Sequence, residues 1–115
     1  MRSKRDFCNV DCPVEAALEV IGGKWKGIIV YRLLGGTKRF NELSRLLPGI
    51  TQRMLTRQLR ELENDHIVAR VVFAEVPPRV EYSLTEYGQL LEPLLKMMQQ
   101  WGRRYLDKIS DTRSH

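Results

Sequence analysis

The sequence has few of the residue patterns that build catalytic or metal centres. Its only cysteines, Cys8 and Cys12, form a C-x3-C pair. This pair offers two thiolates where structural zinc usually takes about four ligands, and no histidine lies near it in the sequence. The chain also lacks a C-x-x-C redox motif and a Gly-rich phosphate-binding loop. An enzyme is therefore the least expected class of function, and we expect no metal and no cofactor.

Long apolar runs are missing as well. The stretch from Ile28 to Tyr31 is the longest near the N-terminus, far below the roughly 20 residues that cross a bilayer. The charged first residues lead into Cys8-Asn9-Val10-Asp11 rather than into the apolar segment of a secretory signal. We therefore expect a cytoplasmic protein without a membrane partner.

Acidic residues are scarce in one part of the chain. The 115 residues, 43% hydrophobic and 29% charged, are typical of a single globular domain, which we expect to span residues 1–115 with a mobile arm at 1–11. The net charge is +5, and residues 37–60 alone carry six cations against the single acid Glu42. A basic block inside a folded domain indicates a polyanionic partner such as nucleic acid.

Apolar residues recur with helical spacing near the start of the chain. This spacing predicts helices at residues 13–21 and 24–34, each ended by a Gly-Gly pair. The buried stripe of the second helix is expected to be Trp25, Ile28, Ile29 and Leu33.

Two further helices are expected to be joined by a tight turn. Asn41 is the expected N-cap of a short third helix, and Thr51 is the expected N-cap of a fourth at residues 52–64. Because Pro48-Gly49 breaks the chain between them, the pattern predicts a helix-turn-helix at residues 39–65.

The pattern becomes strand-like after His66. Residues 68–75 are rich in β-branched and aromatic side chains, residues 80–84 alternate strictly, and Pro77-Pro78 lies between them. This predicts a β-hairpin wing at residues 67–84. The predicted fold class is therefore mainly α with a small β-hairpin wing (α+β), a winged helix-turn-helix.

The last segment, residues 85–109, has a helical pattern that Pro93 must either kink or divide. Its apolar residues cover most of the helix circumference, which requires burial on several sides. A second copy of the chain is the simplest cover, so we expect a homodimer held by N- and C-terminal dimerisation helices. The expected interface residues are Leu90, Leu94, Met97, Met98, Trp101 and Tyr105.

The helix at residues 52–64 has two distinct faces. Leu55, Leu59 and Leu62 fall on one face, and five polar residues fall within an arc of about 140° on another. The major groove accepts one α-helix, and Arg, Gln and Thr can all contact base edges. The alternative is a solvated face on which arginine serves solubility, but acids spaced to neutralise the arginines are sparse. The residues expected to contact DNA are Gln52, Arg53, Thr56, Arg57 and Arg60 on this face, together with Lys38, Arg39 and Thr51, which precede the helix.

Arg79 follows the Pro77-Pro78 tip of the hairpin, and two interpretations remain open for it. A rigid tip would project Arg79 toward the minor groove of bound DNA as a further contact. Alternatively, Arg79 pairs with Glu75 across the hairpin, which is worth at most about 1 kcal/mol.

Cys12 directly precedes Pro13 and is expected to be the N-cap of the first helix. The helix dipole at that position favours a thiolate and hence reactivity toward oxidants. A structural disulfide with Cys8 is not expected in a reducing compartment, and a lone thiol often serves only as a small apolar residue. Cys12 is therefore either a redox-sensing residue or a structural one.

Together these residues resemble the HxlR-type winged helix-turn-helix transcriptional regulators, which are related to the MarR class. The resemblance covers residues 12–102. Each motif alone is not specific, but the order and spacing of all the motifs together are specific to the family. In chain order the motifs are Cys-Pro-Val-Glu (12–15), Ile-Gly-Gly-Lys-Trp (21–25), Arg-Phe-Asn-Glu-Leu (39–43), Pro-Gly-Ile-Thr-Gln-Arg-Met-Leu-Thr (48–56), Leu-Arg-Glu-Leu-Glu (59–63), Val-Pro-Pro-Arg-Val-Glu-Tyr-Ser-Leu-Thr (76–85) and Trp-Gly (101–102).

The resemblance implies a homodimer bound to a two-fold symmetric operator in double-stranded DNA, with the wing on the flanking DNA. The helix implied to enter the major groove carries Gln52, Arg53, Thr56 and Arg57. The resemblance also implies that Cys12 takes the position of a thiol that responds to a small electrophile or oxidant. A winged-helix module for protein interaction, or a thiol-based redox protein without a DNA target, remains the alternative function.

Two positions depart from the family pattern. Asn64-Asp65-His66 stands where the family usually has glycine, so His66 is expected to end the helix in the left-handed conformation. Cys8 is an additional thiol, which could act as the resolving partner of Cys12 within or between chains.

Overall fold

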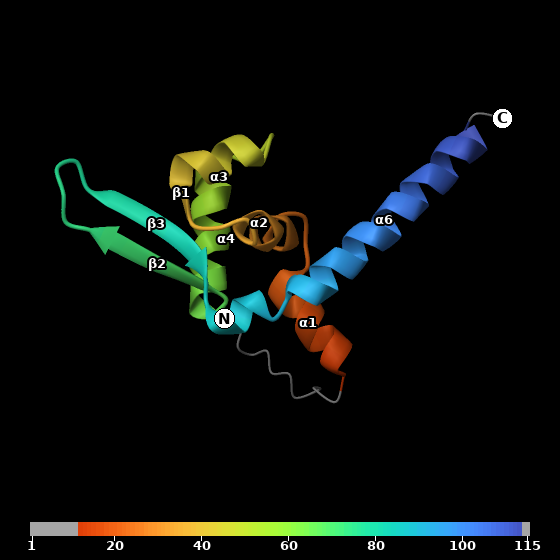
Figure 1. Ribbon diagram of the computed structural model, residues 1–115, viewed down its shortest axis with the longest axis horizontal. Coiled ribbons are helices and arrows are strands. Elements are labelled where there is room, and N and C mark those ends of the chain that lie inside the picture. The colour runs from red at the N-terminus through yellow and green to blue at the C-terminus, as the bar shows by residue number, and fades with distance from the viewer. Residues whose placement is uncertain (1–11, 114–115) are drawn as a thin grey trace.

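The computed structural model describes residues 12–113, so the predicted arm at residues 1–11, including Cys8, lies outside the described residues. The described chain is mainly helical and carries one small antiparallel sheet, which confirms the predicted fold class. In chain order the elements are α1 (Pro13–Ile21), α2 (Lys26–Leu33), β1 (Lys38–Arg39), α3 (Phe40–Leu46), α4 (Gln52–Asn64), β2 (Val68–Phe73), β3 (Arg79–Leu84), α5 (Glu86–Gln89) and α6 (Glu92–Arg113) (Figure 1).

Aliphatic side chains from α2, α3, α4 and the sheet form one core. The largest fully buried side chains are those of Ile29, Val30, Leu43, Leu47, Leu55, Leu59, Leu62 and Val68. Burying one such side chain contributes about 1.5–3 kcal/mol, so this cluster dominates the stability of the domain. Because α4 turns its leucine face into the core, its opposite face is held outward, as the sequence predicted.

The buried face of α2 differs from the predicted one. Lys26, Ile29, Val30 and Leu33 are buried, whereas Ile28 is 41% exposed. The four buried residues have the i, i+3, i+4, i+7 spacing of one helix face. Ile29 and Leu33 were therefore predicted correctly, and Trp25 packs against the core partly buried. The prediction was wrong for Ile28, because Lys26 and Val30 complete the stripe and a lysine is not counted in a pattern of apolar residues.

The turn between α3 and α4 has the predicted form. Gly49 adopts a φ of 92°, a left-handed conformation that glycine reaches without steric cost. Thr51 is the N-cap of α4, since its hydroxyl oxygen accepts a hydrogen bond of 3.0 Å from the Met54 N–H. The predicted helix-turn-helix is therefore present.

The start of α3 was predicted two residue positions too late. Asn41 is not the N-cap, because α3 begins at Phe40 and Arg39 precedes it as the cap residue. The Arg39 N–H donates a hydrogen bond of 2.8 Å to Glu42 Oε1. The reason is tertiary: Lys38 and Arg39 form β1 and pair with β3, which orients the chain as it enters the helix.

The wing is an antiparallel hairpin of β2 and β3, with Val68 opposite Leu84 and Phe73 opposite Arg79. β1 adds a third strand, so the strand order is β1-β3-β2. The sequence did not predict β1, because two residues are too few to show an alternating pattern. His66 has a φ of 64° between α4 and the wing, which confirms it as the left-handed helix terminator.

The predicted helix at residues 85–109 is two helices, α5 and α6. Pro93 lies in the first turn of α6, where its missing N–H breaks no helical hydrogen bond. A Cβ at Gly88 would clash with the Ile67 carbonyl oxygen, so α5 can approach the wing only through glycine. α6 then extends away from the rest of the molecule (Figure 1). Over residues 12–113 no helix combines the length and the apolar character needed to span a bilayer.

Candidate nucleic-acid interface

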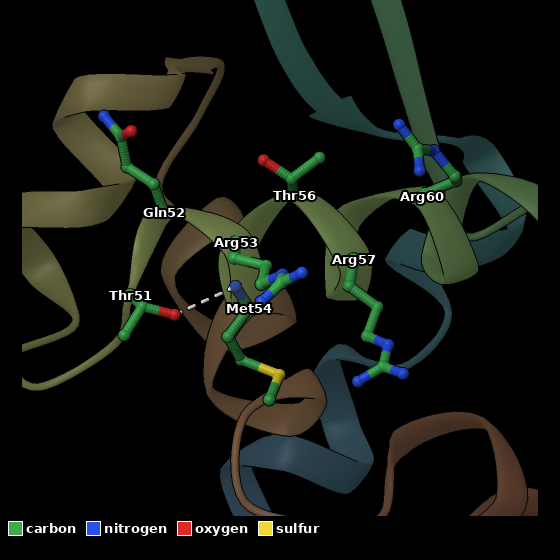
Figure 2. Close-up of a pocket in the computed structure, with 7 residues that line it drawn as sticks. All are labelled: Thr51, Gln52, Arg53, Met54, Thr56, Arg57 and Arg60. Carbon is green, nitrogen blue, oxygen red and sulfur yellow. Dashed lines mark hydrogen bonds between the residues drawn. The ribbon is translucent and has the colours of Figure 1, made fainter.

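The exposed face of α4 carries the polar residues that the sequence predicted to contact DNA. Figure 2 shows Gln52, Thr56 and Arg60 pointing to one side of the helix and Arg57 pointing to the other. These residues and Arg53 are all exposed, and with Thr51 and Met54 they line a shallow, open depression along the helix. The helix therefore presents guanidinium, amide and hydroxyl groups to any molecule that covers it.

The arginines of this face have no acidic partners in the part of the chain that the structure describes. Within residues 12–113, none of Arg53, Arg57 and Arg60 forms an ion pair. A solvated helix face more often carries acids spaced to pair with its cations. Unpaired guanidinium groups raise the local positive potential and remain available to phosphate oxygens or guanine edges. The arrangement therefore favours a nucleic-acid surface over a merely solvated one.

A buried ion pair connects α4 to α2. Lys26 Nζ lies 2.5 Å from Glu61 Oε1, and the two side chains are 10% and 37% exposed. Sequence reasoning did not find this pair, although Lys26 shares the spacing of the buried residues of α2. The pair helps to set the position of α4 relative to the core.

Replacing Glu61 with alanine is expected to lower the free energy of unfolding by about 2–3 kcal/mol, because it leaves the Lys26 ammonium buried without its carboxylate. The expected loss is smaller than the roughly 3–5 kcal/mol for breaking a fully buried ion pair, because Glu61 is partly exposed. Urea unfolding followed by circular dichroism measures the change. The control is Glu92→Ala, which breaks the exposed pair of Glu92 with Lys96 at 3.1 Å and should change stability by less than about 0.5 kcal/mol. Equal effects of the two substitutions would contradict a structural role for the buried pair.

Lys38 and Arg39 do not lie on the α4 face. They form β1, the edge strand that pairs with β3, and neither lines the depression along α4. Arg39 is exposed and Lys38 is half-buried. The structure therefore separates these two predicted contacts from the residues of α4.

Arg79 is not projected from the tip of the wing. It is the first residue of β3, and its guanidinium lies 3.2 Å from the Glu75 carboxylate and 3.6 Å from that of Glu81. The same guanidinium lies 4.1 Å from the centroid of the Phe73 ring. These contacts match the predicted alternative in which Arg79 pairs with Glu75.

Cys12 is the N-cap of α1, as predicted. Its Sγ accepts a hydrogen bond of 3.4 Å from the Glu15 N–H, and the residue is exposed. In the described part of the chain, no three His, Cys, Asp or Glu side chains are grouped so that they could hold a metal ion. Cys12 is therefore an accessible thiol at a helix N-terminus rather than a buried apolar residue.

α1 and α6 leave large apolar side chains in contact with solvent. All six residues predicted for a dimer interface are exposed, and the rings of Trp101 and Tyr105 stack with their centroids 5.2 Å apart. On α1, Val14 and Leu18 are 66% and 60% exposed. Apolar surface of this kind usually marks a site of protein association.

Comparison with known proteins places the chain in one family. Residues 20–110 match the HxlR-like helix-turn-helix family. The chain is 60% identical over 98 residues to the HTH-type transcriptional regulator YdeP of Bacillus subtilis (strain 168), a match that covers 85% of this chain and 77% of YdeP. Among solved structures, the redox regulator HypR in its reduced form is similar at 58% identity and a TM-score of 0.83, covering 87% of this chain and 99% of HypR. The reduced form of YodB from B. subtilis is similar at 41% identity and a TM-score of 0.72, covering 82% of this chain and 93% of YodB. The chain therefore belongs to the HxlR-like family of winged helix-turn-helix transcriptional regulators, which its sequence motifs and its fold had both indicated.

Proposed function

We propose that this regulator binds a two-fold symmetric operator as a homodimer, with α4 of each copy in a major groove. One observation carries the proposal: the arginines of α4 are exposed and have no acidic partner among residues 12–113, while the leucines of the same helix are buried. A helix anchored in this way can enter a groove about 12 Å wide, where an arginine grips guanine O6 and N7. In symmetric helix-turn-helix dimers the two recognition helices lie about one turn of DNA apart.

A second copy of the chain is the proposed cover for the apolar side chains of α1 and α6. These two helices carry Val14 and Leu18, and Met97, Trp101 and Leu106, all more than half exposed. α6 extends away from the body of the domain (Figure 1), so little of the same chain can cover it. Trp and Met side chains are enriched in the cores of protein interfaces.

Oxidation of Cys12 is the proposed switch of DNA binding. Cys12 is exposed and begins α1, a helix that we assign to the dimer interface. HypR is described as a redox regulator and has been solved in oxidized and reduced forms, and YodB in reduced and diamide-treated forms. A covalent change at the start of α1 would shift one copy against the other, and both α4 helices could then no longer fit successive major grooves.

The oxidation needs two thiols and one oxidant. Diamide takes two electrons and two protons from a pair of thiols, becoming the hydrazine derivative while the thiols form a disulfide. The proposed second thiol is Cys8, of the same chain or of the other copy.

Selection of bound sites from random-sequence duplexes tests the DNA-binding proposal. We expect the reduced protein to enrich an inverted repeat whose half-sites are centred about 10 base pairs apart, as in symmetric helix-turn-helix dimers. Enrichment of a single unrepeated half-site would contradict the dimeric arrangement. No enrichment at all would contradict sequence-specific binding.

The selected duplex then tests the switch. We expect diamide to change the affinity of the wild type by at least tenfold, equivalent to about 1.4 kcal/mol, and to leave that of Cys12→Ser unchanged. Serine is itself a good N-cap, so this variant should keep α1 and the affinity of the reduced protein. Loss of the response in Cys8→Ser alone would place the sensing thiol at Cys8. If diamide leaves the affinity of the wild type unchanged, Cys12 is only the structural N-cap of α1.

A further inference from the structure

A small polar cavity lies between α4 and the wing. Its volume is about 260 Å³, and it is lined by Thr56, Leu59, Arg60, Glu63, Arg70 and Tyr82. Thr56 and Arg60 also line the depression along the exposed face of α4, so the cavity adjoins the surface that we propose to enter the major groove. Arg70 was not among the residues predicted to contact DNA, because it lies on β2 and outside the helix-turn-helix.

The position of Arg70 in the sheet explains why it reaches this cavity. Alternate residues of a strand share a face, so Arg70 lies on the same face of β2 as Val68, which is fully buried. Opposite Arg70 in the register of β3 is Tyr82. Arg70 itself is exposed. A guanidinium on the core-facing side of a strand is tolerated here because the cavity keeps it in contact with solvent.

The cavity presents mainly hydrogen-bond donors. Within residues 12–113 neither Arg60 nor Arg70 forms an ion pair, and Glu63 is the single carboxylate of the lining. The Tyr82 hydroxyl has no hydrogen-bond partner among the described residues. Two guanidinium groups, two hydroxyls and one carboxylate give the cavity a net positive charge. Such a site suits one anionic group with several oxygen acceptors, such as a phosphate.

We propose that Arg60 and Arg70 together hold one backbone phosphate of the bound DNA, with the hydroxyls of Thr56 and Tyr82 as further donors. This proposal rests on the proposed insertion of α4 into the major groove. A helix in that groove has sugar-phosphate backbones along its sides, so a site between α4 and the wing meets phosphate rather than base edges. Phosphate contacts set the register of a protein on the duplex and carry no sequence information directly.

The affinity of Arg70→Ala for two duplexes tests this assignment. The probes are the duplex selected with the wild type and a scrambled duplex of the same length and composition. We expect Arg70→Ala to weaken binding to both by roughly tenfold. The slope of log affinity against log salt concentration should become shallower by about one unit, as expected for one lost phosphate contact. The control is Arg103→Ala, an exposed arginine on α6, which should leave both the affinities and the slope unchanged.

Two further variants separate the phosphate from other ligands of the cavity. Arg70→Lys keeps the charge but loses the planar fork, so it should restore the salt slope while recovering only part of the affinity. Glu63→Gln removes the one carboxylate of the lining and should tighten binding to both duplexes.

Unchanged affinity and slope in Arg70→Ala would overturn the phosphate site. A loss confined to one base position of the selected duplex would also overturn it, because Arg70 would then read a base. Failure of the wild type to bind either duplex would instead contradict the proposed function itself.

Discussion

Replacing Arg53 and Arg57 together with alanine is expected to lower affinity for the selected duplex by about 100-fold or more without unfolding the domain. Each arginine that grips a guanine is worth about 1–3 kcal/mol of discrimination, and every 1.4 kcal/mol is about tenfold in affinity. The fold should survive because both side chains are exposed, while the leucines that anchor α4 are unchanged. Fluorescence anisotropy with the labelled duplex measures the affinity, and thermal denaturation checks the fold.

The single variants show what each arginine contacts. A loss in Arg53→Ala or Arg57→Ala that relaxes the preference at one base position indicates a guanine contact. An equal loss for all sequences would assign that arginine to phosphate. Arg103→Ala on α6 again serves as the control for the loss of one positive charge. If the double variant binds as tightly as the wild type, α4 is not the DNA-reading helix.

Introducing aspartate at both Met97 and Trp101 is expected to convert the protein to a monomer and to weaken operator binding by at least about 100-fold. Both side chains are at least 65% exposed in the single chain, so the substitutions should spare the core and act only on association. Joining two half-site contacts in one dimer can raise affinity by about 10²–10⁴, and this gain is lost when the copies separate. Sedimentation velocity at micromolar concentration measures the oligomeric state.

The matched control places the same new residue on the other side of α6. At about 100° per residue, Arg103 lies roughly opposite the stripe of Met97 and Trp101, so Arg103→Asp should leave the dimer intact.

Removing the chain from Leu94 onward should expose apolar surface and give either aggregates or a monomer that binds one half-site poorly. A wild type that sediments as a monomer under these conditions would remove the dimer from the proposal.

Local patterns in the sequence were enough to predict most of the elements that build the site. The capping roles of Thr51 and Cys12 depend only on residues within one turn, and the structure has both. The same holds for the two faces of α4, where the spacing of Leu55, Leu59 and Leu62 already determines which side is buried. His66 ends α4 because few non-glycine residues accept a positive φ, and histidine is among those enriched there.

Features that depend on residues distant in sequence were missed or left open. β1 exists only because β3 offers it an edge, and its pairing moved the start of α3 from the predicted position. Arg70 was overlooked because its neighbours in the cavity come from α4 and β3. The sequence left two environments open for Arg79, and the chain folds with its guanidinium against Glu75, Glu81 and Phe73.

The sequence by itself determined the helix-turn-helix and the division of α4 into a buried and a basic face, because periodicity, caps and turn residues act over a few positions. The family was indicated by the resemblance of the motifs, through their order and spacing along the chain. Only the tertiary structure decided which charges remain free to meet DNA. Lys26 is buried and paired with Glu61, and Arg79 is held within the wing, while the arginines of α4 have no acidic partner among residues 12–113. The physical reason is that the partner of a charged side chain depends on which elements pack together, and Coulomb attraction over a few ångströms depends on distance in space rather than in sequence.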